Sequence, residues 1–304
     1  MKYVNDRISR RASLILLIVL LAACNRPDPT RPVNSHPSSA AKTGSFEGTL
    51  TSGNDTRHYL LHVPASYQPG TPTPLVINFH GYGSNSSQEE ALSGMSRKAD
   101  QAGFLVVYPD GLNHQWFEGP DANGAADRQF VRDLIKHLQD QYTINPRRIY
   151  AAGMSDGGGM TNRMGCDLAD VFAAIAPVAG AYKFWQDCQP ARSIPVLAFH
   201  GKADNIVPYE GNRQRMLPPI HDWAAAWAQR DQCTTASTVT QPVQDVTREA
   251  WSGCQGDAEV ILYAIDNHGH SWPGSDRLPG ITSQAINATD VMWDFFVAHP
   301  QPAP

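Results

Sequence analysis

Short apolar segments alternate along this chain with longer stretches in which apolar residues recur at helical spacing. Two of the apolar segments, 75–80 (LVINFH) and 104–108 (FLVVY), are almost continuously apolar, which is typical of strands buried on both faces of a sheet. Strands are predicted at 57–64, 75–80, 104–108, 148–152, 196–200 and 260–265.

Helical periodicity predicts helices over 88–102, 125–142 and 290–298. In the second of these, apolar side chains from Phe130 to Leu138 lie on one stripe of the helix. Strands that alternate with helices favour an α/β fold, in which a mostly parallel sheet carries helices on both faces. Because no change of composition interrupts residues 45–304, we expect them to form a single domain.

The first 23 residues have the pattern of an export signal. Basic residues precede an apolar stretch over 12–23 that is too short to span a bilayer comfortably. The stretch ends in Leu21-Ala22-Ala23-Cys24, which resembles the lipobox of bacterial lipoproteins, and this resemblance implies that Cys24 carries a lipid. The alternative is an ordinary signal peptide in which Cys24 has no such role. The expected location is therefore the periplasmic or cell-surface side of a membrane, or the exterior if the protein is secreted.

The composition of the chain predicts a tether followed by a folded domain, and it argues against a nucleic-acid-binding function. Residues 24–44 are rich in Pro, Ser, Asn and Thr, which predicts a flexible tether between the lipid and the domain. The remaining chain is apolar enough to build a core, since hydrophobic residues make up 41% and charged residues only 17% of the sequence. The net charge of −5 provides no positive surface for nucleic acid, so no nucleic-acid partner is expected. With an acidic domain, attachment to a membrane would depend on the lipid alone.

Four cysteines remain after Cys24 and are expected to form two disulfides, because an exported protein folds in an oxidising compartment. Four cysteines allow three pairings. We favour Cys166–Cys188 and Cys233–Cys254, in which each bond closes a loop within one stretch of chain. A metal site is the alternative, but the sequence contains no Cys-x-x-Cys motif and no tight cluster of Cys and His.

The strongest chemical motif is Gly153-Met154-Ser155-Asp156-Gly157, which directly follows the predicted strand 148–152. A strand that turns sharply into a helix can hold a serine in a strained, exposed position, and glycines on either side prevent clashes at the turn. The motif therefore predicts that Ser155 is a nucleophile. The alternative is a glycine-rich turn in which the serine has no chemical role.

A nucleophilic serine needs a base, an acid that orients the base, and donors that stabilise an oxyanion. Asp204 follows the predicted strand 196–200, and His270 follows the predicted strand 260–265, so both would lie at the same edge of the sheet as Ser155. The backbone N–H groups of Tyr82, in the loop after strand 75–80, and of Asp156 are the predicted oxyanion donors.

Taken together, several motifs in this order resemble the polyhydroxybutyrate-depolymerase-like and feruloyl-esterase-like serine esterases, a group of α/β-hydrolases. They are the segments 80–83 (HGYG), 108–111 (YPDG) with Trp116, 145–158, 172–180, 200–209 (HGKADNIVPY) and 269–274 (GHSWPG). The resemblance covers about residues 57–298. It implies an α/β-hydrolase fold and a catalytic set of Ser155, Asp204 and His270. His268 departs from the family pattern, so the base could be His268 or His270, and His270 is favoured because it directly precedes 271–273.

This resemblance implies a serine esterase that hydrolyses short-chain or aromatic esters, such as feruloyl, acetyl or hydroxyalkanoate esters, without a metal or organic cofactor. The alternatives are a peptidase that uses the same residues, a non-catalytic ligand-binding lipoprotein, or a metallohydrolase built on Asp266, His268 and His270. Trp116 and Trp272, with Tyr82, are candidates for an apolar substrate-binding wall, and core packing is the alternative for them. His80 and His200 are expected to brace loops.

Overall fold

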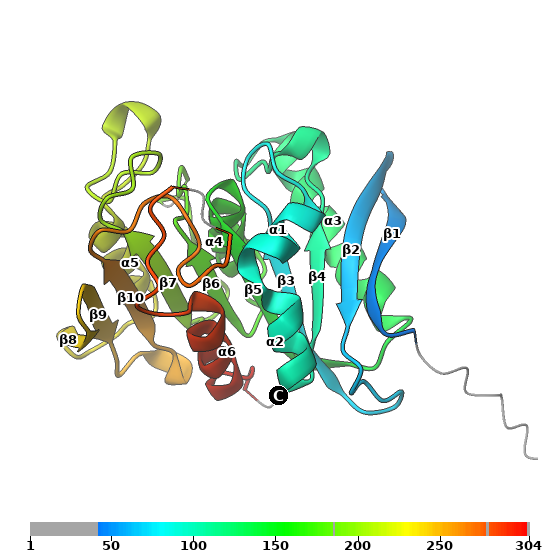
Figure 1. Ribbon diagram of the computed structural model, residues 1–304. Helices are drawn as coiled ribbons and strands as arrows, with labels where there is room; N and C mark the ends of the chain where they lie inside the picture. Colours follow the sequence, from blue (N-terminus) through cyan, green and yellow to red (C-terminus); the bar gives the residue numbers. More distant parts are fainter. Residues whose placement is uncertain (1–41, 185, 278–279, 303–304) are drawn as a thin grey trace, which may run out of the picture. The chain divides into compact units, whose positions relative to one another are not determined.

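A ten-stranded mixed sheet runs through the part of the chain that the structure describes (Figure 1). The structure is a computed structural model, and it describes residues 42–184, 186–277 and 280–302. The predicted signal peptide over 1–23, the lipid site Cys24 and almost the whole predicted tether 24–44 lie outside the described residues. Those assignments therefore stay predictions.

The strands follow the spatial order β1-β2-β4-β3-β5-β6-β7-β10-β9-β8. The six from β4 to β10 in this order are parallel to one another, and antiparallel strands flank them on both sides. Their bounds are β1 Gly44–Ser52, β2 Asp55–Val63, β3 Thr73–Phe79, β4 Leu105–Pro109, β5 Ile144–Met154, β6 Ala174–Val178, β7 Val196–Gly201, β8 Thr238–Val243, β9 Val246–Trp251 and β10 Val260–Ile265.

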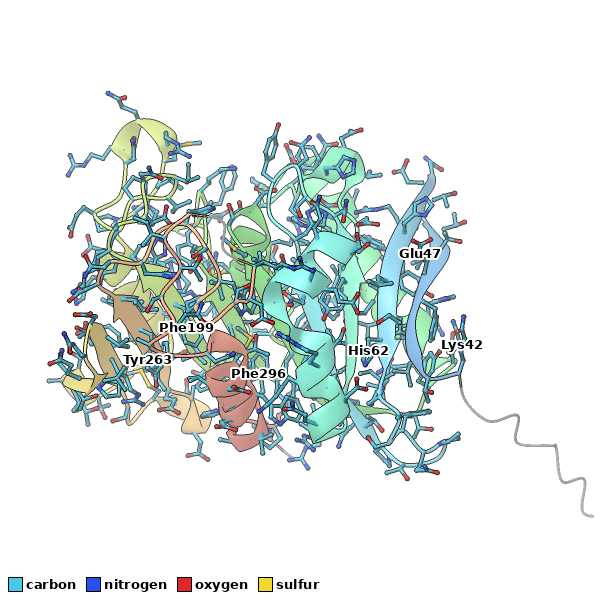
Figure 2. All side chains as sticks on the ribbon, in the orientation of Figure 1. Lys42, Glu47, His62, Phe199, Tyr263 and Phe296 are labelled. Carbon is cyan, nitrogen blue, oxygen red and sulfur yellow. A yellow bond between two sulfur atoms is a disulfide. The ribbon has the colours of Figure 1, made fainter. Side chains whose placement is uncertain are left out.

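Helices cover both faces of the sheet. Side chains of α3, α4 and α5 belong to the core on one face, while those of α2 and α6 belong to the core on the other, on which α1 also lies (Figure 1). Their bounds are α1 Ser86–Ser93, α2 Met95–Ala102, α3 Ala122–Gln139, α4 Asp156–Asp167, α5 Ile220–Arg230 and α6 Ala288–Ala298. Aromatic stacking ties α6 to the sheet, since Phe296 stacks on Tyr150 of β5 with ring centroids 4.5 Å apart. Figure 2 labels Phe296 together with Phe199 and Tyr263, which stack on each other on β7 and β10.

All six predicted strands are present, with ends that differ by a few residues. The prediction of one continuous helix over 88–102 is wrong. Gly94 adopts a left-handed conformation (φ 62°) and divides the segment into α1 and α2. The prediction lacks β1, β6, β8, β9 and α5. β1 and β8 are sheet-edge strands with exposed, polar residues, and β6 (AIAPV) contains alanines and a proline, which are poor strand formers.

Both predicted disulfides, Cys166–Cys188 and Cys233–Cys254, are present in the structure. The first joins the end of α4 to the loop that precedes β7, and the second joins the segment after α5 to the segment after β9. Within the described residues, no helix has the length and apolar character that crossing a membrane requires.

Parallel order places the carboxyl ends of β3, β5, β7 and β10 at one edge of the sheet. The loops that leave this edge carry the residues singled out by the motifs. In open α/β sheets ligands bind at this edge, so it is the place to look for a site.

Candidate active site

Ser155 lies at the turn between β5 and α4 in a strained backbone conformation. Its φ of 58° and ψ of −115° are rare for a residue with a side chain. Three hydrogen bonds hold the turn: the Ser155 N–H donates to the Val178 carbonyl, and its own carbonyl accepts from the N–H groups of Gly159 and Ala181, all at 3.0 Å. This is the geometry that the motif predicts for an exposed nucleophile.

Close backbone contacts require glycine at Gly153 and Gly157, on either side of Ser155. A side chain at Gly157 would collide with the carbonyl groups of Phe79 and His80 at the end of β3. At Gly81, a Cβ atom would lie 3.4 Å from the Cβ of Ser155. The loop after β3 therefore runs directly against the serine.

Asp204 and His270 meet at the same edge of the sheet. The Nδ1–H of His270 donates to Oδ2 of Asp204 at 2.8 Å, while Oδ1 of Asp204 accepts from the N–H groups of Ile206 (2.9 Å) and Val207 (2.8 Å). Burial by itself would raise the pKa of Asp204, but the hydrogen bonds and the neighbouring histidines outweigh it and hold this pKa below its usual value. Asp204 is thus a buried carboxylate that orients the ring of His270.

The structure therefore joins two of the three predicted side chains by a direct hydrogen bond. Among the described residues, no hydrogen bond joins the ring of His270 to the hydroxyl of Ser155. Such bonds between a nucleophile and its base are often long in unliganded enzymes and shorten when substrate binds.

His268, the alternative base, has both ring nitrogens occupied by backbone groups. Its Nε2–H donates to the Ser271 carbonyl at 3.1 Å, and its Nδ1 accepts from the Ser283 N–H at 2.9 Å. The side chain is buried, and burial lowers its pKa. These contacts favour His270 as the base and make His268 a brace between two segments of the loop.

His80 and His200 are also buried braces. His80 donates from Nδ1 to the Gly81 carbonyl (2.7 Å) and accepts at Nε2 from the Gly111 N–H (3.0 Å). His200 donates from Nε2 to the Val207 carbonyl at 2.8 Å, and burial lowers its pKa to about 4. Both contacts agree with the expectation that these histidines hold loops in place.

The two predicted oxyanion donors lie on adjacent segments. Asp156 is the first residue of α4, and Tyr82 lies in the loop after β3, next to the Gly81 position that faces Ser155. Neither backbone N–H donates to another group among the described residues. Both remain available to an oxygen atom placed near Ser155.

Trp116 and Trp272 do not line an open surface, which favours the core-packing alternative for both. Trp272 is 1% exposed and donates its indole N–H to Thr289 Oγ1 at 3.0 Å. Trp116 is 4% exposed and packs edge-on against Phe79. The physical reason is that each indole extends inward from its loop into one of the two cores. Of the three aromatic candidates, only Tyr82 is exposed.

The sequence did not reveal that two buried carboxyl groups, those of Asp156 and Glu118, support this site. The carboxylate of Asp156 is buried; its Oδ2 accepts from the Trp116 N–H at 2.7 Å, and its Oδ1 lies 3.6 Å from Lys183 Nζ. Glu118 is also buried, and burial raises its pKa to about 8 although Lys183 opposes this shift. An acidic residue directly after the nucleophile was a signal that could have indicated such a contact.

In the described part of the chain, no group of three or more His, Cys, Asp or Glu residues is arranged to hold a metal ion. The proposed metal set of Asp266, His268 and His270 is not assembled, because the ring nitrogens of His268 are bonded to backbone and Nδ1 of His270 is bonded to Asp204.

Comparison with known proteins shows that the chain is similar to esterases. Residues 58–208 match the family described as "Esterase PHB depolymerase". The chain is 34% identical to feruloyl esterase B of Piromyces equi over 232 residues, which cover 71% of this chain and 42% of that protein. It is 27% identical to feruloyl esterase C of Emericella nidulans over 264 residues, 82% of this chain and 88% of that protein.

Among solved structures, acetyl xylan esterase from Aspergillus awamori is similar with a TM-score of 0.65, covering 83% of this chain and 99% of that one at 13% identity. At this identity the match establishes a shared fold and confirms the predicted α/β-hydrolase architecture.

Proposed function

We propose that this chain, a polyhydroxybutyrate-depolymerase-like and feruloyl-esterase-like serine esterase, hydrolyses short-chain or aromatic carboxylic esters through an acyl-enzyme on Ser155. The observation that carries the proposal is the hydrogen bond from His270 to the buried carboxylate of Asp204, at the sheet edge where Ser155 occupies a strained turn. A serine turn with no chemical role would not need an oriented imidazole at the same edge of the sheet.

The reaction would follow the mechanism of serine hydrolases. Nε2 of His270 takes the proton of the Ser155 hydroxyl while Oγ attacks the ester carbonyl, and Asp204 stabilises the resulting imidazolium. The N–H groups of Tyr82 and Asp156 donate to the tetrahedral oxyanion. His270 then returns the proton to the leaving alcohol, and a water molecule activated by the same ring releases the acid from Ser155.

The names of the relatives support the class of ester. Feruloyl esterases act on an aromatic acyl group, and acetyl xylan esterases act on a short one. Tyr82, which is 73% exposed on the loop beside Ser155, offers an aromatic surface to an acyl group of either kind. We therefore infer that feruloyl, acetyl and hydroxyalkanoate esters are the substrates to test first.

An ester panel measured with the purified domain tests this proposal. We expect p-nitrophenyl acetate, p-nitrophenyl butyrate and methyl ferulate to be hydrolysed in the presence of EDTA, and a serine-directed phosphonate to abolish the activity. Ser155→Ala is the control and should be inactive on every ester. Strong loss with EDTA, or a preference for peptide or palmitoyl substrates, would contradict the proposal.

We further propose that the protein is exported and attached to a membrane through a lipid on Cys24. Two disulfides are consistent with an oxidising compartment. Metabolic labelling with a fatty acid should tag the wild type but not Cys24→Ser. Equal labelling of both proteins would instead favour an ordinary signal peptide and a secreted enzyme.

A further inference from the structure

The two proposed oxyanion donors are far apart in the chain, so something must hold them at a fixed separation. Tyr82 lies on the loop after β3, while Asp156 begins α4, more than seventy positions later. An oxyanion site works only when its donors are set in advance at hydrogen-bond distance from the position of the developing charge. A contact between the two segments would therefore affect catalysis directly.

Trp116 makes such a contact with each segment. Its backbone N–H donates to Oδ2 of Asp156 at 2.7 Å, and its indole Nε1–H donates to the carbonyl of His80 at 3.0 Å. Both bonds are buried, because Trp116, Asp156 and His80 are 4%, 5% and 0% exposed. One residue thus links the first residue of α4 to the loop that carries Tyr82.

Further bonds keep the loop from moving independently of Trp116. The Gly83 N–H donates to the His114 carbonyl at 2.7 Å, so the chain just before Trp116 also holds the far end of the loop. The ring of Trp116 packs against the rings of Phe79 and His80, with centroids 5.1 and 5.2 Å away. On the other side, Lys183 lies near the second oxygen of Asp156. The link is therefore supported at both of its ends.

We propose that Trp116 and the carboxylate of Asp156 are positioning residues, which set the separation of the Tyr82 and Asp156 N–H groups. This inference rests on the proposed esterase function. Neither side chain touches the substrate; each acts through the backbone donors. Loss of one oxyanion donor costs about 10²- to 10³-fold in kcat in serine hydrolases, so misplacement of the pair should cost less, about 10- to 100-fold.

The first test is Trp116→Phe, which removes the indole donor but keeps an aromatic ring and the backbone N–H. We expect kcat on p-nitrophenyl acetate to fall about 10- to 100-fold with KM little changed, because the bond matters mainly to the transition state. A boronic acid that mimics the tetrahedral intermediate should bind more weakly by a similar factor.

The matched control is Trp227→Phe, which removes another buried indole bond, from Nε1 to Asn162 Oδ1 at 3.0 Å, on α5. Both variants should lose thermal stability, but only Trp116→Phe should lose kcat. Equal losses of kcat in the two variants, or wild-type kcat in Trp116→Phe, would overturn the inference.

Asp156 provides an independent test. Asp156→Asn retains an oxygen that can accept from the Trp116 N–H, whereas Asp156→Ala does not. We expect Asp156→Ala to lower kcat to about the level of Trp116→Phe, and Asp156→Asn to recover most of it. If both Asp156 variants keep wild-type kcat, the carboxylate has no positioning role. If the wild type hydrolyses none of the esters, the proposed function fails and this inference with it, whereas an active wild type with unaffected variants overturns this inference alone.

Discussion

The two sides of the candidate site are built on different principles. On the relay side, which consists of Asp204 and His270, the two residues are proposed to act through their side chains, and a single hydrogen bond of 2.8 Å joins them. On the oxyanion side, Tyr82 and Asp156 are proposed to act through their backbone N–H groups, and other side chains hold those groups in place. The same sheet edge therefore carries one part defined by residue type and one part defined by backbone position.

This difference explains which functional residues can be recognised from the sequence. On the relay side the chemistry requires a carboxylate and an imidazole, so residue types alone mark the candidates. On the oxyanion side almost any residue supplies an N–H, and the residues that fix its position are ordinary core residues such as Trp116. Substitutions on the two sides should consequently differ in size and kind.

The largest effect should come from the groups that exchange the proton. We expect Ser155→Ala or His270→Ala to lower kcat on p-nitrophenyl acetate by about 10⁵- to 10⁶-fold, as when a serine hydrolase loses its nucleophile or base. His268→Ala should cost far less in kcat, because the His268 ring is bonded to backbone groups on both sides. Steady-state kinetics on the three variants would decide the assignment, and an inactive His268 variant beside an active His270 variant would reverse it.

Asp204→Asn should give the next largest effect, a loss of about 10⁴-fold in kcat. The amide keeps the size of the side chain but loses the charge that orients His270 and stabilises its imidazolium. The measurement is kcat at saturating ester, with circular dichroism to show that the variant is folded. A loss of less than tenfold would mean that the charge of Asp204 has no catalytic importance.

The two disulfides permit a comparison of how much each side contributes to the stability of the fold, since each disulfide is in or near an element that leads to one side of the site. Cys166 lies in the last turn of the helix that begins at Asp156, and Cys254 lies shortly before β10, the strand that leads to His270. With sequence separations of 22 and 21 residues, the chain-entropy model predicts that each bond stabilises the fold by about 3 kcal/mol.

Chemical denaturation of the double variants Cys166→Ala/Cys188→Ala and Cys233→Ala/Cys254→Ala would measure these contributions. Peptide mapping of the unreduced wild type is the control for the pairing. Free thiols or crossed pairs would contradict the assignment.

The last comparison concerns the pH dependence of stability, and here the two sides should respond in opposite directions. The lowered pKa of Asp204 means that its contribution to stability is present above its usual pKa and is lost as pH falls. Glu118, which packs beside Gly159 on the oxyanion side, has a pKa raised to about 8 by burial. Its folded form keeps a proton that the unfolded chain releases above about pH 4.5, so stability falls as pH rises towards 8.

Glu118→Gln tests whether Glu118 makes the fold less stable as pH rises. The variant cannot ionise, so between pH 5 and pH 8 its free energy of unfolding should fall less steeply than that of the wild type, by up to about 1.4 kcal/mol per pH unit. Burial also raises the pKa of Glu89 to about 8, but Glu89 is present in both proteins and its effect cancels in the comparison. Parallel pH profiles for the two proteins would show that Glu118 does not hold its proton in the folded state.

The sequence by itself determined the features that depend on local chemistry. The glycines around Ser155 predicted the strained turn, because a side chain at Gly157 would collide with neighbouring backbone. Continuous apolar runs predicted the buried strands β3 and β4, since both faces of each strand pack against helices. The spacing of the cysteines favoured the pairing that the structure has.

The tertiary structure alone decided the features that depend on direction and burial. His268 and His270 are two positions apart in one loop, and only the folded loop turns one ring to Asp204 and the other to backbone groups. Trp116 and Trp272 stand on loops near the site, yet both indoles extend into the core. A residue's type indicates what its side chain can do, but the partners that it meets depend on chain segments far away in sequence, and those segments come together only in the folded protein.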